Sequence, residues 1–481
     1  MKSVAIIGAG ITGLTAAFRL SQKGIDVTVY EAGSRVGGVI QSIRDKGFLA
    51  ECGPNTIIET SPKITSLVRD LGLEKRKLYT DPNAEDRFIV RGGKPVHLPA
   101  SQLGFFKTHL FSPGAKARLF REPFIHRAPA EAEENLEQFV LRRLGREMLD
   151  YAINPFVAGV YAGDPARLSV KHAFPKLHAL EQKYGSLILG QFLGARERKR
   201  SGEVSKQSAS KFSFDEGLEV LTDELRAKLA GNIELQTPVT AIERNGKSWI
   251  VTSTVQNHSE RHEYDAVLFT APTHKLESIS MNLGSRFDLS SLKTIYYPPV
   301  TSVVLGFRRE DVEHPCNGFG ALVPEVERFK ILGVIFSSAL FPNRAPKGQI
   351  AITCYVGGSR NPELALQPPE IIRRAVLNDL EIILGVRGQP VFEHQFVYRH
   401  AIPQYEVGYG KTKELMNNIE RNAPGFFFAG HFRDGIALGD SIVSGDNAAE
   451  RLEKFFTATA DAAGVQASAC GCGCQHEHAK S

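Results

Sequence analysis

Residues 3–38 read SVAIIGAGITGLTAAFRLSQKGIDVTVYEAGSRVGG, which combines the signals of two strands, a helix and a glycine loop. The β-branched run at residues 4–7 predicts a buried parallel strand. The apolar spacing of residues 14–20 predicts a helix, with Gly24 as its stop. A second strand is predicted over residues 26–30, so the stretch has the strand, helix, strand order of a Rossmann-like α/β unit.

Between the first strand and the helix lies the glycine pattern GAGITG at residues 8–13. Its first glycine makes a tight turn, its second lets the backbone approach a pyrophosphate, and its third lets the helix pack closely on the strand. Glu31, at the end of the second strand, is placed to accept hydrogen bonds from a ribose hydroxyl. The unit predicts a dinucleotide site. It leaves open an NAD-dependent dehydrogenase, a flavin oxidase and a protein that binds a nucleotide without catalysis.

The residues after the second strand distinguish flavin from nicotinamide. EAGSRVGG at residues 31–38 adds a further glycine turn and Arg35, a cation suited to the flavin pyrophosphate. This stretch resembles the start of the FAD-dependent amine oxidase and phytoene desaturase superfamily, which implies that GPN at residues 53–55 lies near the isoalloxazine ring. No second GxGxxG follows and Cys52 has no CxxxxC partner, which argues against a two-nucleotide disulfide reductase.

Composition bounds the class of protein. The chain has 481 residues, 42% of them hydrophobic, which suggests two or three globular domains. Its net charge of +5 is too small to argue for nucleic acid as the main partner. Three of the six cysteines, Cys52, Cys316 and Cys354, are scattered through the body, as is typical of a reduced intracellular chain. No run of about 18 apolar residues occurs, so no membrane-spanning helix is predicted.

Several long stretches resemble the protoporphyrinogen oxidase family of this superfamily, in the same order along the chain: NPFVAGVYAGDPARLSVKHAFPKL (154–177), YYPPVTSVVLGF (296–307), GFGALVP (318–324), GVIFSSALFPNRAP (333–346) and AIPQYEVGY (401–409). The resemblance implies oxidation of a porphyrinogen to a porphyrin by FAD and molecular oxygen in haem biosynthesis. Three two-electron cycles would release hydrogen peroxide, with the chemistry carried by FAD. A non-catalytic flavin or porphyrin carrier and an oxidase of amines or carotenoids remain as alternatives.

The resemblance also implies the architecture. The fold class is α/β (α+β overall), with a Rossmann-like FAD-binding domain, a mixed-sheet substrate domain and a helical membrane-associating domain. The polar residues 194–211 predict a flexible loop, residues 88–99 predict a hairpin with Gly92 and Gly93 at its turn, and Asn245-Gly246 predicts a turn between two strands. In chain order we expect an FAD-binding segment at 1–80, a substrate-domain hairpin at 81–94, the helical domain at 95–211, a second FAD-binding segment at 212–272, the substrate-binding domain at 273–414, a third FAD-binding segment at 415–456 and a flexible tail at 457–481.

By motif position, the resemblance assigns contacts with FAD to all three segments of its domain. The expected contacts are Gly8, Ala9, Gly10, Ile11, Thr12, Gly13, Glu31, Ala32, Arg35, Gly37, Gly38, Gly53, Pro54, Asn55, Thr56, Val239, Gly430, Ile436, Ala437 and Leu438.

The family places its flat substrate between the second sheet and the helical part. By motif position, Leu322 and Phe336 match apolar residues that sandwich the macrocycle, and the turn from Gly159 to Gly163 matches one wall. From the residues alone, a place in a hydrophobic core is the favoured interpretation of Leu322 and Phe336. Gln41 stands where several family members carry a basic residue that pairs with a substrate propionate, so propionate anchoring is weaker here or occurs elsewhere.

Two arginines, Arg44 and Arg91, are candidates for this anchoring by residue type only. Coproporphyrinogen carries four propionates and protoporphyrinogen two, and the sequence does not give the number of cations that face the pocket. A coproporphyrinogen III oxidase of the same fold therefore remains an alternative.

Residues 104–127 combine five phenylalanines with the cations Lys107, Lys116, Arg118, Arg121 and Arg127. A basic and aromatic segment of this kind binds an anionic membrane surface. The alternative is a pair of helices whose phenylalanines pack inward beneath solvated cations. We expect a cytoplasmic protein attached peripherally to the cytoplasmic membrane, with a homodimer and a handover of product to ferrochelatase as further expectations.

The tail SACGCGCQHEHAKS at residues 468–481 gathers thiols and imidazoles, which suit zinc or copper(I). The CxCxC pattern lacks the usual spacing of zinc ligands, so metal capture or redox sensing stands beside a mobile tail without a metal. The residues concerned are Cys470, Cys472, Cys474, His476 and His478.

Overall fold

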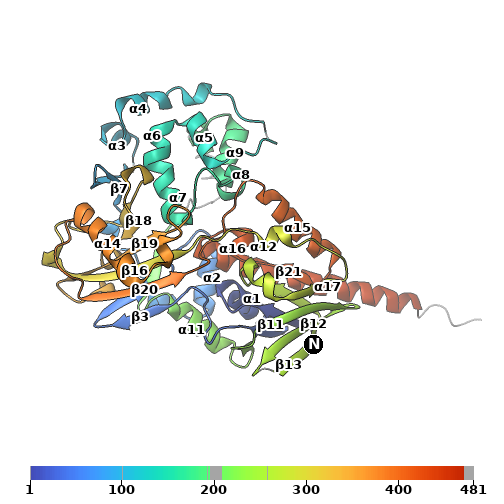
Figure 1. Cartoon of the computed structure of the whole chain (residues 1–481). Helices are drawn as coiled ribbons and strands as arrows, with labels where there is room; N and C mark the ends of the chain where they lie inside the picture. Colours follow the sequence, from blue (N-terminus) through green and yellow to red (C-terminus); the bar gives the residue numbers. More distant parts are fainter. Residues whose placement is uncertain are drawn as a thin grey trace, which may run out of the picture.

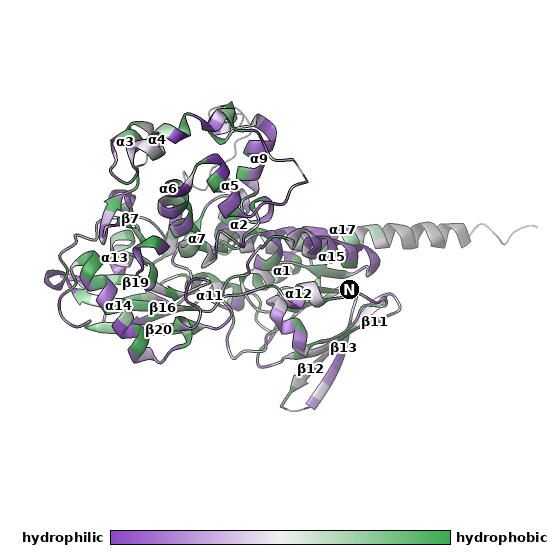
Figure 2. Cartoon of the chain, turned by 45° about the horizontal axis from the view of Figure 1, so that its top comes forward, coloured by the Kyte–Doolittle hydropathy of each residue, from purple (hydrophilic) through white to green (hydrophobic). Residues whose placement is uncertain are grey.

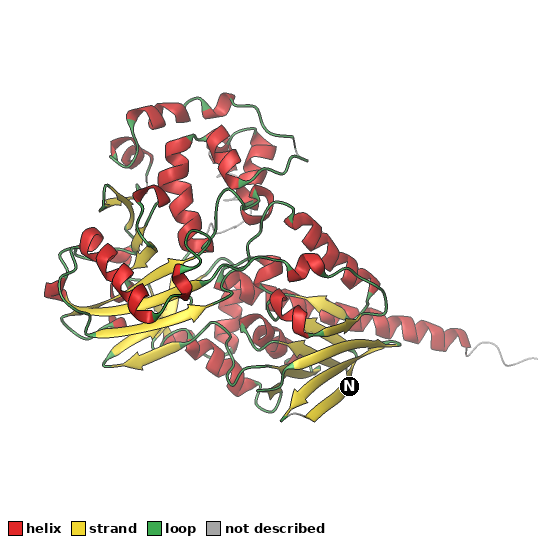
Figure 3. Cartoon of the chain, viewed as in Figure 1, coloured by secondary structure: helices red, strands yellow, loops and turns green. Residues whose placement is uncertain are grey.

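Figure 1 shows the computed structural model, which describes residues 2–99, 101–129, 131–191, 193–194, 209–256 and 258–470. Helices α3 to α9 gather at one end of the molecule, above the sheet that contains β16 and β19. Helices α1 and α17 lie with β21 on the other side. The helical end and the strands below it are clearly separated in Figure 3.

A parallel sheet forms the first layer. Its order is β10 (Ile233–Glu234), β2 (Asp26–Tyr30), β1 (Ser3–Ile7), β14 (Ala266–Phe269) and β21 (Phe426–Phe428), and every neighbouring pair is parallel. Residues 4–7 of β1 are buried, as expected of a strand covered on both faces. The strand, helix, strand prediction from residues 3–38 is therefore confirmed.

Helices α1 (Ile11–Ser21) and α17 (Leu438–Cys470) pack against each other beside this sheet. Their backbones approach so closely that a Cβ on Gly445 would lie 2.3 Å from the carbonyl oxygen of Thr12. The C-terminal segment thus returns to the first nucleotide unit, as the sequence predicted. Helices α2 (Pro62–Asp70) and α11 (Glu219–Lys228) pack into the same hydrophobic core as this sheet and α1.

A seven-stranded mixed sheet forms the second layer. Its order is β20 (Phe392–Tyr398), β16 (Val300–Arg308), β19 (Gln349–Gly357), β18 (Ile331–Ile335), β17 (Gly320–Leu322), β7 (Arg87–Arg91) and β8 (Lys94–His97). Only the β17–β7 pair is parallel. The predicted hairpin at residues 88–99 is confirmed, because β7 and β8 pair antiparallel around a glycine turn. Helix α14 (Pro369–Leu384) buries its apolar face against this sheet.

Three smaller sheets complete the strands. One contains β13 (His258–Tyr264), β12 (Ser248–Val255), β11 (Val239–Asn245) and β15 (Ser280–Asn282), with the predicted turn after Asn245. The others pair β3 (Ser42–Asp45) with β4 (Phe48–Glu51), and join β5 (Ile57–Ile58), β9 (Lys211–Phe214) and β6 (Lys77–Tyr79). The outer strand β13 is hydrophilic and exposed (Figure 2), which protects this edge from pairing with another chain.

The helical part runs from α3 to α9. Its elements are α3 (Gln102–Lys107), α4 (Pro113–Leu119), η3 (Glu122–Phe124), α5 (Leu136–Arg143), α6 (Arg146–Met148), η4 (Leu149–Ile153), α7 (Asn154–Tyr161), α8 (Val170–Ala173) and α9 (Pro175–Tyr184). The remaining helices of the described residues are η1 (Glu74–Arg76), η2 (Pro82–Ala84), η5 (Thr273–Ser278), α12 (Ser290–Lys293), η6 (Arg309–Asp311), η7 (Glu325–Glu327), α13 (Ser337–Leu340), η8 (Pro342–Arg344), η9 (Leu364–Leu366), α15 (Tyr409–Asn422) and α16 (His431–Asp434). None of the described helices is both long and apolar enough to span a membrane.

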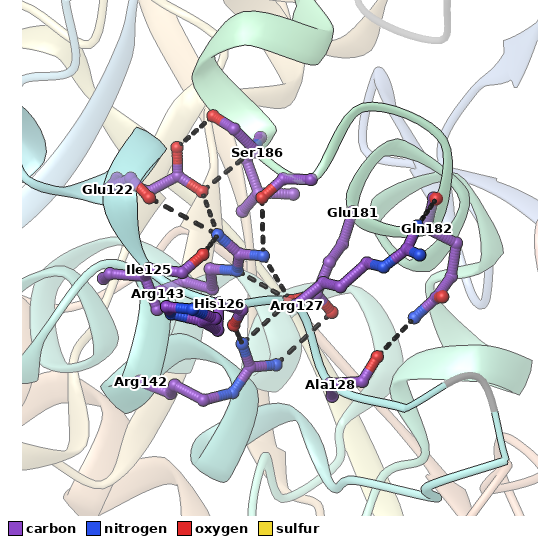
Figure 4. A network of polar contacts seen from close by, with 12 residues as sticks. Glu122, Ile125, His126, Arg127, Ala128, Arg142, Arg143, Glu181, Gln182 and Ser186 are labelled. Carbon is purple, nitrogen blue, oxygen red and sulfur yellow. Dashed lines mark hydrogen bonds and ion pairs between the residues drawn. The ribbon is translucent and has the colours of Figure 1, made fainter.

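An ionic network is buried inside the helical part (Figure 4). The Arg143 guanidinium is fully buried and lies 3.1 Å from a carboxylate oxygen of Glu122 and 2.5 Å from one of Glu181. Glu122 also accepts hydrogen bonds from the backbone N–H groups of Leu187, at 2.9 Å, and Ile188, at 3.3 Å. The network joins η3, α5 and the chain after α9, so it fixes the position of η3 and of the segment that leads into it.

Two predicted flexible segments have different outcomes. Most of the loop predicted at residues 194–211 lies outside the described residues, and its last residue begins β9. The tail predicted to be flexible from residue 457 begins instead as a continuation of α17 to Cys470. The alanines of residues 458–469 favour helix, which explains the difference. The remaining tail residues Cys472, Cys474, His476 and His478 lie outside the described residues.

Candidate active site

The carboxyl ends of the parallel strands meet at one edge of the first sheet. There the glycine loop follows β1, Glu31 follows β2, Thr270 follows β14 and Gly430 follows β21. The Gly8 N–H donates to the carbonyl oxygen of Tyr30 at 2.8 Å, and the Thr270 hydroxyl donates to the carbonyl oxygen of Gly8 at 3.0 Å. Ligands of open α/β sheets bind in the crevice at this edge, where the strand order reverses.

The three glycines of the loop have different steric roles. Gly8 has φ +109°, which favours glycine. A Cβ on Gly13 would lie 2.1 Å from the carbonyl oxygen of Gly8, so no larger residue fits there. A Cβ on Gly10 would meet nothing within 4 Å. The space over Gly10, at the N-terminus of α1, is therefore open to a phosphate.

Glu31 holds the loop and its own turn together. Its carboxylate accepts hydrogen bonds from the N–H of Ala9 at 3.0 Å and of Gly33 at 2.7 Å. The N–H of Thr237 donates to its carbonyl oxygen at 2.9 Å, which brings the start of β11, and with it Val239, beside the loop. The structure thus brings the first two of the predicted FAD segments together at Glu31.

The second glycine turn folds back on the first loop. The N–H of Gly37 donates to the carbonyl oxygen of Ala9 at 2.8 Å. Arg35, which we expect at the flavin pyrophosphate, donates to the carbonyl oxygens of Val36 and Ile40 at 3.0 Å each and of Gly38 at 2.5 Å. Its guanidinium therefore braces the turn, and its contact with FAD stays a prediction. Ala32, beside it, is exposed.

The loop that returns from β21 closes the same edge. The N–H of Gly430 donates to the Ser444 hydroxyl at 2.8 Å, and the Thr12 hydroxyl donates to the carbonyl oxygen of Ser441 at 3.0 Å. The N–H of Ala437 donates to the Asp440 carboxylate at 3.3 Å. Ile436 and Ala437 thereby precede α17, which begins at Leu438, next to the start of α1.

These features fit the ADP half of FAD. A phosphate has open space over Gly10 at a helix N-terminus, and Glu31 ends the neighbouring strand where a ribose is recognised. When bound, FAD supplies two-electron redox chemistry.

The predicted flavin loop at residues 53–56 lies against the second sheet. A Cβ on Gly53 would lie 2.4 Å from the carbonyl oxygen of Val39, so this position requires glycine. The Asn55 side-chain amide donates to the Tyr355 hydroxyl at 2.6 Å and to the carbonyl oxygen of Gly53 at 3.3 Å. Sequence reasoning missed Tyr355, which lies on β19 and reaches the loop across 300 residues of chain.

Two histidines at this edge were also missed. His274 follows β14 and His431 follows β21, and burial lowers the pKa of each to about 4. The His274 ring stacks on that of His400, with centroids 4.3 Å apart. Nδ1 of His274 and Nε2 of His431 are buried and make no hydrogen bond within the described part of the chain. Both imidazoles are neutral at physiological pH and can each give or accept one further hydrogen bond.

The predicted substrate wall is assembled by strand register. Leu322 of β17 pairs with Gly333 of β18, which pairs with Tyr355 of β19. Directly opposed residues share a face of a sheet, so these three form one row. Helix α7 covers the row, because a Cβ on Gly159 would lie 2.3 Å from Cδ2 of Leu322. Gly163 lies beyond α7, where a Cβ would be 2.3 Å from Oε1 of Gln404.

The structure corrects the prediction for Phe336. Its ring is fully buried in the core on the α14 side of the sheet, with its centroid 6.2 Å from that of Phe88 and 5.4 Å from that of His314. Gly333 and Ile335 alternate onto the face of Leu322, so the next residue points to the opposite side. Phe336 is a core residue, and Leu322 is half-buried on the predicted wall.

The two candidate propionate anchors, Arg91 and Arg44, differ in whether their guanidinium groups already have partners. Arg91 pairs with Glu147 at 2.7 Å, also donates to the carbonyl oxygen of Leu110, and lies over the ring of Tyr151 at 4.2 Å, so its guanidinium is already engaged. Arg44 is exposed on β3. The N–H of Cys52 donates to the carbonyl oxygen of Gln41 at 2.9 Å, and the Gln41 side chain is half-buried.

Arg87 is a cation that sequence reasoning missed. It pairs with Gly320 in the β7–β17 ladder and therefore shares the face of Leu322. Its guanidinium lies 5.6 Å from the ring centroid of Phe319 and has no acidic partner in the described part of the chain. The pairing of β7 with β17 places Arg87 on this face, and no local sequence pattern predicts a pairing between strands so far apart in the chain.

Residues 11–452 match the family model described as flavin containing amine oxidoreductase. The chain is 37% identical over 485 residues to protoporphyrinogen oxidase 2 of Arabidopsis thaliana, covering 96% of this chain and 95% of that protein. It is 28% identical over 459 residues to the coproporphyrinogen III oxidase of Bacillus subtilis, covering 92% and 96%.

Solved structures give the same placement. A crystal structure from Exiguobacterium sp. 255-15, assigned to protoporphyrinogen oxidase, matches with a TM-score of 0.79 and 26% identity, covering 94% of this chain and 98% of that one. Putrescine oxidase shares the fold at 15% identity, with a TM-score of 0.67 and coverage of 94% and 99%. This chain is an FAD-dependent oxidoreductase that belongs to the flavin containing amine oxidoreductase family, with protoporphyrinogen oxidases among its full-length relatives.

Proposed function

We propose that this protein oxidises protoporphyrinogen IX to protoporphyrin IX in haem biosynthesis, with FAD as cofactor and molecular oxygen as oxidant. The observation that carries the proposal is the 37% identity to a protoporphyrinogen oxidase over nearly the whole of both chains. The macrocycle loses six hydrogen atoms. Three oxygen molecules accept them two at a time and become three molecules of hydrogen peroxide.

The row of Leu322, Gly333 and Tyr355 suits a flat apolar substrate. Leu322 and Tyr355 supply apolar surface on either side of Gly333, which has no side chain. Helix α7 closes the row from above, and Asn55 places the flavin loop at its end. The chain's own residues hold and orient the macrocycle and exclude water there. Burying a few hundred Å² of it contributes several kcal/mol at about 25 cal/mol per Å².

A direct comparison of substrates tests the proposal. The purified protein is mixed in air with protoporphyrinogen IX or coproporphyrinogen III, and the fluorescence of the porphyrin product is followed. We expect a higher kcat/KM with protoporphyrinogen IX. A preference for coproporphyrinogen III would replace the proposed substrate, and turnover of neither would overturn the proposal.

Arg87 is proposed to hold a propionate of the substrate. Replacing it by alanine removes a charge-assisted hydrogen bond, which is typically about 1.5–3 kcal/mol, so KM should rise at least about tenfold while kcat changes little. Steady-state kinetics of Arg87→Ala measure both constants. Lys94→Ala, on the exposed adjacent strand, is the matched control. Equal KM values for Arg87→Ala and the wild type would contradict the role.

Peripheral attachment to a membrane is proposed from the surface of α3, α4 and η3. The apolar patch, defined as Leu103, Phe106, Phe120 and Phe124, is exposed, and Phe124 is 83% accessible. Lys107, Lys116, Arg118 and Arg121 come from the same segment. Phe111 of the same segment is buried, as the alternative of phenylalanines that pack inward predicts for it. The patch lies at the far end of the helical part from the first sheet (Figure 1), so the two can act independently.

The patch predicts binding to anionic lipid. Phe120→Ser with Phe124→Ser should weaken binding to phosphatidylglycerol-containing vesicles by at least about tenfold, because two apolar side chains no longer enter the interface. Vesicle co-sedimentation measures the affinity. Ile382→Ser, which alters an isoleucine that is 61% exposed on α14, is the matched control. Wild-type affinity in the double variant would contradict the assignment.

The cytoplasmic location, the homodimer and the handover to ferrochelatase remain proposals. The handover is proposed because an apolar porphyrin formed at a membrane surface must be passed to the enzyme that inserts iron.

A further inference from the structure

Tyr355 stands where three parts of the molecule meet. It lies on β19, in the row that includes Leu322, and packs against the buried cluster that contains Ala158 of α7 and Ala162 just after this helix. Figure 1 shows α7 next to β18 and β19. Tyr355 therefore lies on the proposed substrate side, where the second sheet meets α7.

The hydroxyl of the same residue belongs to the flavin side. It accepts a hydrogen bond from the Asn55 amide at 2.6 Å and donates to the carbonyl oxygen of Gly53 at 3.3 Å. The Asn55 amide also donates to that carbonyl oxygen at 3.3 Å. The three groups form a closed triangle, in which the phenol is the one member that comes from the second sheet.

Within the described part of the chain, the Asn55 side chain makes hydrogen bonds to the phenol and to Gly53 alone. Gly53 is restrained by its close approach to Val39, which fixes the start of the loop. The Tyr355 hydroxyl is therefore the group that ties the Asn55 side chain to the second sheet. Burial raises the pKa of this hydroxyl well above its usual range, so it stays protonated and can donate at any physiological pH.

We propose that Tyr355 is a positioning residue that locks the flavin loop to the substrate-side sheet through its hydroxyl group. This inference rests on the proposed function for the place of the flavin and the substrate. The sheet that receives the macrocycle then also holds the loop beside the isoalloxazine ring, so the two reactants keep one relative position. Geometry of this kind is worth most where a hydrogen atom must move between two rigid rings.

Tyr355→Phe is the decisive variant, because it removes one oxygen atom and keeps the ring. We expect the FAD dissociation constant to rise about tenfold, the size of effect of one buried hydrogen bond, with a shifted visible flavin spectrum. We expect kcat to fall about tenfold or more, with KM for the porphyrinogen changed less than about threefold, because the ring still packs. Tyr151→Phe is the matched control. It removes a hydroxyl of η4 that donates to the carboxylate of Glu327 in η7, and it should leave the flavin spectrum unchanged.

A double-mutant cycle separates positioning from simple packing. Tyr355→Phe, Asn55→Ala and the double variant are compared by FAD affinity and flavin spectrum, and by thermal unfolding of the apoprotein. We expect strongly non-additive effects on FAD, because either change breaks the same bond. Additive effects, or a lower unfolding temperature with an unchanged flavin spectrum, would overturn the inference. FAD affinity and spectrum need no substrate, so this result stands apart from whether porphyrinogen is oxidised.

Discussion

Gly10→Val should produce a folded protein that no longer retains FAD. Gly10 has φ −72° and ψ 173°, which any residue adopts, and a Cβ there meets nothing within 4 Å. The free energy of unfolding of the apoprotein should change by less than about 1 kcal/mol. The valine would occupy the space proposed for the pyrophosphate, so FAD affinity should fall at least about a hundredfold, or about 2.7 kcal/mol.

Gly13→Ala provides the contrast for this prediction. Its Cβ would lie 2.1 Å from the carbonyl oxygen of Gly8 and 2.8 Å from the Thr270 hydroxyl, so it strains the fold itself. Denaturant unfolding and FAD titration of both apoproteins measure the two quantities. Gly10→Val should lose only FAD, whereas Gly13→Ala should lose stability as well. Tight FAD binding by Gly10→Val would contradict the placement of the phosphates.

Arg143→Met should destabilise the helical part by about 3–5 kcal/mol. Arg143, Glu122 and Glu181 are all buried, and removal of the cation leaves two carboxylates without it (Figure 4). The carbonyl oxygens of Ile125 and Gly185 lose a donor as well. Chemical unfolding, together with limited proteolysis between α4 and α9, measures the loss.

Arg142→Met is the matched control for this variant. Arg142 is adjacent in sequence and pairs with Glu134 and Glu181, but its side chain is 26% exposed. Water can solvate the carboxylates that a partly exposed arginine leaves behind. Arg142→Met should therefore lower the free energy of unfolding less than Arg143→Met does. Equal losses in the two variants would show that burial of the network does not matter.

The local units of the fold could be predicted from sequence because their signals are local. The glycine loop, the strand that ends at Glu31 and the turn after Asn245 each depend on residues within a few positions of one another. The order of strands in the second sheet could not, because β7 pairs with β17 across more than 200 residues. Arg87 and Tyr355 were missed for this reason.

The site predictions failed where one face of a strand had to be chosen. Phe336 follows β18 by one residue and points away from Leu322, since neighbouring residues alternate between faces. Arg91 was a candidate by charge, but its engagement by Glu147 depends on how the helical part folds over β7. In both cases the residue type was compatible with the role, and the long-range geometry decided against it.

This chain is proposed to couple oxidation of a porphyrinogen to reduction of oxygen at FAD. The coupling can be measured as oxygen consumed, hydrogen peroxide formed and porphyrin formed in one reaction of the purified, FAD-loaded protein with protoporphyrinogen IX. We expect three molecules of oxygen consumed and three of peroxide formed for each porphyrin. Bound FAD with no porphyrin formed above the rate without protein would contradict it and would favour a carrier.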